Sequence, residues 1–271
     1  MPGGILSEPI KATSWKEASC GATVCLPSMV TTNRLSHVKV IVEDLRKREG
    51  RNLVAAGVYG SVARGEDRQH SDIDLIVVVR RKRPRIRHTL DSGILVTFLQ
   101  ETPEEARNEV RGAYPGLNDA LGGWRSLRPI YDPSGLLRRL RDEARGPNVR
   151  AFQKSAQLHF LKAFEDLGKL WNAIEARNTD EAREMAIWFS GAAMGSLFDL
   201  EGLVLKTGRR AFIELRRYGR LGTAIRRLRY VSMSLARMQR LSESIWGELL
   251  DRAKAKGLRL PPFPRDARGT L

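Results

Sequence analysis

The most constraining feature of the sequence is the segment of residues 58–79, VYGSVARGEDRQHSDIDLIVVV. The β-branched run after Asp74 predicts a buried strand, and the apolar run that ends before Gly60 predicts another. Residues two apart in a strand point to the same side, so we expect Asp72 and Asp74 to face one spot. Two carboxylates so placed repel each other, and burying them unpaired is unfavourable by several kcal/mol. The segment therefore predicts a strand–turn–strand unit with a cation site.

The turn between the two predicted strands has the properties of a phosphate-binding site. Gly60 lets the backbone approach a phosphate closely, and Ser61 supplies a hydroxyl at the start of a short predicted helix. Mg²⁺ suits the two aspartates, because it takes oxygen ligands and usually shares them with substrate phosphates. A phosphate-binding turn beside a metal-binding pair indicates phosphoryl or nucleotidyl transfer. The structural alternative is an edge strand with two solvated aspartates.

Residues 60–65 and 71–75, GSVARG and SDIDL, resemble the signature of the DNA polymerase β-type nucleotidyltransferase superfamily. That signature is Gly-Ser, about ten residues, then Asp-x-Asp on a strand, and the form here is most similar to minimal nucleotidyltransferases and kanamycin nucleotidyltransferase-like proteins. The likeness covers roughly residues 53–105 and, more weakly, 124–133. The resemblance implies triphosphate contacts at Gly60 and Ser61, a phosphate contact or a surface role for Arg64, and metal ligands at Asp72 and Asp74.

The sequence departs from this family at one position. Members of the superfamily usually carry a third acid on the following strand, and the matching position in the predicted strand 94–100 is Thr97. A hydroxyl cannot act as a carboxylate base, and a missing general base slows a reaction by about 10²- to 10⁴-fold. Asp199 and Glu201 are candidate replacements, since kanamycin nucleotidyltransferase-like enzymes take a catalytic glutamate from their helical domain. They would act from the same chain or from a dimer partner; the alternative is an exposed helix face or an ion pair with a nearby arginine.

The remaining pattern predicts an α+β protein in which a mixed sheet with helices precedes an all-α bundle. Strand patterns stop before Gly146-Pro147, and helical periodicity follows from Val149 to about Gly257. We therefore predict four parts: an N-terminal extension of low order (1–33), a nucleotidyltransferase domain (34–146), a helical bundle domain (147–258) and a tail (259–271).

The charge of the chain bears on its partners. Its 47 Lys and Arg against 31 Asp and Glu leave a net charge of +16, which favours a polyanionic partner such as RNA or an acidic protein. The basic residues concentrate in the segments 80–87 and 206–229, where a plain solvated face is the alternative. Only two cysteines occur and no apolar run approaches a membrane span, so we expect a cytoplasmic protein with no membrane association.

Two functions are compatible with these residues. The first is an enzyme that uses Mg²⁺ to transfer a nucleoside monophosphate, by default AMP from ATP, to an acceptor hydroxyl with release of pyrophosphate. Its acceptor would be a small molecule, a protein side chain or an RNA end, and the resemblance suggests a homodimer. The second is a weakly active or inactive nucleotidyltransferase fold that binds RNA or a protein partner, as an antitoxin does. Retention of both aspartates favours the enzyme.

Overall fold

The computed structural model describes residues 34–82, 86–146 and 148–266. All of them belong to one compact unit, Asn33–Leu271. The predicted N-terminal extension lies outside the described residues. The last strand ends at Tyr131 and only helices follow from Val149, but the division of this unit into two domains stays a prediction.

A five-stranded mixed sheet forms the first part of this unit. Its strands are β1 (Leu53–Tyr59), β2 (Ile73–Val79), β3 (Ile86–Asp91), β4 (Ile94–Glu101) and β5 (Arg128–Tyr131). Their order is β3-β4-β2-β1-β5; β2 and β4 run parallel, and the other neighbours run antiparallel. The predicted strands at β1, β2 and β4 are thereby confirmed. The sequence did not predict β3, because this edge strand is largely exposed and lacks an apolar pattern.

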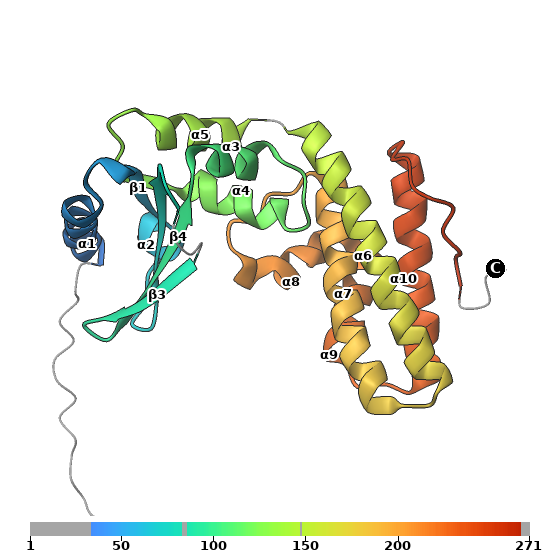
Figure 1. Ribbon diagram of the computed structural model, residues 1–271. Coiled ribbons are helices and arrows are strands. Elements are labelled where there is room, and N and C mark those ends of the chain that lie inside the picture. The colour runs from blue at the N-terminus through green and yellow to red at the C-terminus, as the bar shows by residue number, and fades with distance from the viewer. Residues whose placement is uncertain (1–33, 83–85, 147, 267–271) are drawn as a thin grey trace, which may run out of the picture. The chain divides into compact units, whose positions relative to one another are not determined.

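Helices cover both faces of the sheet (Figure 1). The first, α1 (Arg34–Glu49), packs with Ile73, Leu75 and Val77 of β2. Helices α3 (Pro103–Arg111), α4 (Leu117–Ser126) and α5 (Leu136–Arg145) pack with Ile76 and Val78 on the opposite face. Alternation along β2 therefore turns Asp74 toward the face covered by α3–α5, as the two-residue period predicts.

The second part of the unit is helical. Its helices are α6 (Val149–Glu175), α7 (Thr179–Glu201), α8 (Ala211–Glu214), α9 (Gly219–Tyr230) and α10 (Leu235–Ala255). Their shared core contains the fully buried Phe160, Phe189, Phe198 and Trp246. Among the described helices none combines the length and apolar character needed to cross a membrane.

Helix α7 ends at Glu201 because Gly202 adopts a left-handed conformation with φ +64°. The chain then crosses α4: the Leu205 N–H donates to the Asn118 carbonyl at 3.0 Å. At Gly122 a Cβ atom would lie only 1.8 Å from the Leu205 carbonyl oxygen, so this crossing requires glycine. The loop after α7 is thereby fixed against the sheet-covering helices.

Candidate active site

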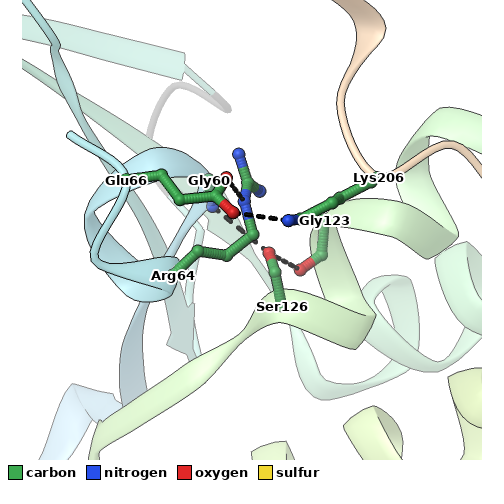
Figure 2. Close-up of polar contacts among 6 residues, drawn as sticks. All are labelled: Gly60, Arg64, Glu66, Gly123, Ser126 and Lys206. Atoms are coloured by element: carbon green, nitrogen blue, oxygen red, sulfur yellow. Dashed lines mark hydrogen bonds and ion pairs between the residues drawn. The ribbon is translucent and has the colours of Figure 1, made fainter. Parts of the chain in front are cut away.

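The predicted phosphate-binding turn lies between β1 and the five-residue helix α2 (Gly60–Arg64). Gly60 has φ +73°, and a Cβ atom there would lie 3.0 Å from Asp74 Oδ2, so backbone conformation and space both call for glycine. The Gly60 N–H donates to Ser126 Oγ at 3.3 Å, and Ser126 Oγ donates to the Gly123 carbonyl at 2.8 Å (Figure 2). Helix α4 thus holds the turn in place.

The two aspartates and the turn line the same cavity, which has a volume of about 810 Å³. Burial, and then the negative charge of Asp72, raise the pKa of Asp74 to about 6, while the positive charge of Arg209 opposes the rise. Burial and the charge of Asp74 also raise the pKa of Tyr59, which pairs with Asp74 across β1 and β2. The site therefore concentrates negative charge in a partly desolvated place.

Basic side chains enter this cavity from two segments far apart in the sequence. Arg64 and Arg68 come from the chain around α2, and Lys206, Arg209 and Arg210 come from the loop after α7. The sequence analysis assigned Lys206, Arg209 and Arg210 to a basic segment but not to this cavity. Nothing in the sequence shows that their loop crosses α4. The cavity is large enough for a nucleotide, and its basic groups have the charge to bind a triphosphate.

Glu66 links these two groups of basic residues. It accepts a hydrogen bond from Arg64 Nε at 2.9 Å and a short one from Lys206 Nζ (Figure 2). The Lys206 and Arg64 hydrogen bonds lower the pKa of Glu66 to about 2. Glu66 is therefore an anion placed where incoming phosphate groups would compete for the same two cations.

The aspartate pair has the donor set of a magnesium site that is completed by its substrate. Within the described residues no three His, Cys, Asp or Glu side chains converge as a metal centre, so the protein offers two carboxylates. Mg²⁺ is commonly bound by one or two carboxylates, with phosphate oxygens and water as the other ligands. A hard cation would also relieve the repulsion that raises the pKa of Asp74.

The strand register agrees with the predicted position of the missing third acid. Thr97 of β4 lies directly beside Asp74 of β2. Its Oγ1 lies 3.1 Å from Nδ1 of His88, which is its neighbour on β3. One carboxylate is therefore present among the four residues aligned across the sheet, Tyr59, Asp74, Thr97 and His88. A carboxylate that acts as general base has to come from another element.

The helical candidates Asp199 and Glu201 do not line the cavity of Asp72 and Asp74. Both line a second cavity of about 420 Å³. Asp199 is buried and accepts from Nδ1 of His159 at 2.7 Å. Glu201 forms ion pairs with Lys256 at 2.7 Å and Arg252 at 3.9 Å. A single chain thus does not bring them to the aspartate pair, and a contribution from a dimer partner stays a prediction.

The glycine turn, the two aspartates and the basic loop thus line one cavity beside the mixed sheet. Residues 38–121 match the family of nucleotidyltransferase domains. In this region the chain is similar to polymerase β-like nucleotidyltransferases. The predicted resemblance and fold class are thereby confirmed.

Two curated relatives are aminoglycoside nucleotidyltransferases (4') from Staphylococcus aureus and a Bacillus species, each 27% identical over 154 residues. The match spans 55% of this chain and 59% of the relatives' length. A solved nucleotidyltransferase-like protein from Exiguobacterium sibiricum 255-15 superposes with a TM-score of 0.56 at 13% identity, over 81% of this chain and 77% of that one. The structural likeness therefore extends over most of the chain.

Proposed function

We propose that the protein transfers a nucleoside monophosphate from a nucleoside triphosphate, by default ATP, to an acceptor hydroxyl and releases pyrophosphate. The observation that carries this proposal is the single cavity in which Gly60 and Ser61 lie beside Asp72 and Asp74. The basic loop around Arg209 lines the same cavity. Phosphate, metal and a second substrate would meet at this place.

In the proposed reaction the side chains of the cavity bind and orient the triphosphate. The backbone and hydroxyl at Gly60-Ser61 would approach one phosphate, while Lys206 and Arg209 would bind others from the basic loop. Asp72 and Asp74 would hold the divalent cation, which supplies stabilisation of the negative charge that develops on the phosphate oxygens. The acceptor oxygen forms a bond to the α-phosphorus as the bond to the β-phosphate oxygen breaks, and pyrophosphate leaves with that electron pair.

The first acceptor to consider is an aminoglycoside, because the two curated relatives are named for that substrate class. Other hydroxylated small molecules, a protein side chain and an RNA end belong to the same proposal. A homodimer and a cytoplasmic location with access to the nucleotide pool stay predictions.

The test is transfer of label from each of the four α-³²P-labelled nucleoside triphosphates, with and without Mg²⁺. Kanamycin A, RNA and a cell extract serve as acceptors, and Asp72→Asn as the matched inactive variant. We expect a labelled acceptor only with metal and only with the wild-type chain. Calorimetry with a non-hydrolysable ATP analogue should show binding that needs Mg²⁺ and is lost in Asp72→Asn. Metal-independent binding that survives this substitution would contradict the proposal.

The alternative of a polyanion-binding module is supported by one observation. Residues 206–229 carry nine Lys or Arg against Glu214 alone, and Arg216, Arg217 and Arg220 are exposed. Such a surface binds phosphate backbones with little sequence preference, and its affinity falls steeply with salt. RNA binding that persists in Asp72→Asn and weakens with salt, without any nucleotide transfer, would favour this alternative. The other predicted segment, 80–87, lies partly outside the described residues.

A further inference from the structure

We propose that Asp119 is the general base that accepts the proton of the acceptor hydroxyl. This inference rests on the proposed function and assigns a catalytic residue to the same cavity. Asp119 lies in the first turn of α4 and lines the same cavity as Asp72 and Asp74.

The place of Asp119 follows from one face of helix α4. Asp119, Gly123 and Ser126 are spaced four and three residues apart, so they share a side of the helix. Ser126 Oγ accepts a hydrogen bond from the Gly60 N–H, and Gly123 packs against Tyr59. Asp119 lies on the same face of α4 and also lines the cavity. At its far end this carboxylate faces Gly208, where a Cβ atom would lie 3.4 Å from Asp119 Oδ1. Asp119 therefore lies between the nucleotide turn and the basic loop.

The other ionisable side chains of the cavity that could accept a proton have other roles or partners. Asp72 and Asp74 form the proposed metal pair, and Glu66 is bound by Arg64 and Lys206. The raised pKa of Tyr59 keeps its hydroxyl protonated near neutral pH. Among the described residues that line the cavity there is no histidine.

Asp119 is the remaining carboxylate. Within the described part of the chain, its side chain has no hydrogen bond or ion pair. Burial raises the pKa of Asp119, which brings its basicity closer to the pH at which such an enzyme works. An accessible but partly desolvated carboxylate with no partner is the state that a general base needs before its substrate arrives.

The proposed step is balanced without any further reactant. A carboxylate oxygen of Asp119 takes the hydroxyl proton while the acceptor oxygen bonds to the α-phosphorus. The bond between the α-phosphorus and the bridging oxygen breaks, and pyrophosphate carries away the electron pair. The proton on Asp119 passes to solvent before the next turnover.

The experiment compares Asp119→Asn, Asp119→Glu and the control Asp142→Asn, an exposed aspartate of α5. Pyrophosphate release from Mg·ATP is measured with water and with kanamycin A as acceptors. We expect Asp119→Asn to lower kcat by about 10²- to 10⁴-fold while the KM for ATP stays within about threefold. Asp119→Glu should restore part of the rate, and the control should match the wild type. Binding of the ATP analogue and the melting temperature should be unchanged in all three variants.

Each other result counts against the assignment. An active wild type with an equally active Asp119→Asn overturns it and leaves the proposed function standing. Loss of analogue binding or of thermal stability in Asp119→Asn shows a binding or structural role instead, and also overturns it. If the wild type binds the Mg·ATP analogue but releases no pyrophosphate with either acceptor, the inference fails. If it also binds no analogue, the proposed function fails with it.

Discussion

Gly60 and Asp74 approach each other so closely that a Cβ atom on Gly60 would lie 3.0 Å from Asp74 Oδ2. The turn and the aspartate pair are therefore not two neighbouring features but one packed unit. Gly60 also has φ +73°, a backbone conformation that side chains disfavour. Any side chain at this position displaces the carboxylate, the turn or both.

Replacing Gly60 by alanine tests this unit, and Gly65 offers a matched control. Gly65 has φ +68° but nothing within 4 Å of its would-be Cβ atom. Both alanine variants should lose about 1–2 kcal/mol in the free energy of unfolding, because both force a left-handed conformation on a side chain. Only Gly60→Ala should weaken binding of the Mg·ATP analogue, by about tenfold or more, since it moves the acid. Equal binding by the two variants, measured by calorimetry, would show that the close approach has no role in the site.

A second glycine tests how the basic loop is positioned. A Cβ atom at Gly122 would lie 1.8 Å from the Leu205 carbonyl oxygen, so Gly122→Ala must push the loop off α4. We expect a loss of about 1–3 kcal/mol in unfolding free energy, together with weaker analogue binding as Lys206 and Arg209 move away. Gly247→Ala is the control: Gly247 lies in α10 with nothing within 4 Å, and alanine should stabilise that helix by about 0.5–1 kcal/mol. Chemical denaturation and calorimetry measure both quantities.

Glu66 should weaken nucleotide binding, because it occupies Arg64 and Lys206 before any phosphate does. We expect the Glu66→Gln variant to bind the ATP analogue several-fold more tightly than the wild type at low salt. The gain in affinity should be smaller at high salt, where charges are screened. Glu165→Gln is the matched control, since Glu165 is also exposed and forms ion pairs with two lysines of α6. Weaker binding by Glu66→Gln would instead mean that Glu66 holds the two cations in the geometry that phosphates need.

The sequence predicted which residues of the motif lie together better than it predicted the rest of the cavity. Asp72, Asp74, Gly60 and Ser61 lie within one short stretch, so local strand and turn rules were enough to bring them together. The cavity wall that includes Arg209 and Asp119 could not be predicted in this way. It depends on a loop that crosses a distant helix, and that helix, α4, contains two adjacent glycines, which are poor helix formers.

The metal-free protein should be more sensitive to rising pH because of Asp74. An acid whose pKa is raised on folding binds more protons in the folded state, so its contribution to stability falls as pH rises from the ordinary 3.8 through about 6. In EDTA, the Asp74→Asn variant should therefore have a higher melting temperature than the wild type. This difference in melting temperature should be larger at about pH 7 than at about pH 5. Added Mg²⁺ should reduce the difference, because a bound cation offsets the repulsion from Asp72. A difference that does not change with pH would show that Asp74 is not destabilised in the folded protein.

Glu201 provides the last prediction, because the sequence offered it as a catalytic group and the fold places it in a different cavity. Its ion pairs with Lys256 and Arg252 join α7 to α10, so its removal should act on stability. We expect Glu201→Gln to lower the melting temperature by a few degrees and to keep pyrophosphate release within about threefold of the wild type. A fall in kcat of about 10²-fold or more, with light scattering showing a dimer, would instead place Glu201 in the partner's active site. Mixing Glu201→Gln with Asp72→Asn would then restore activity, because one of the two sites in each mixed dimer would have both groups intact.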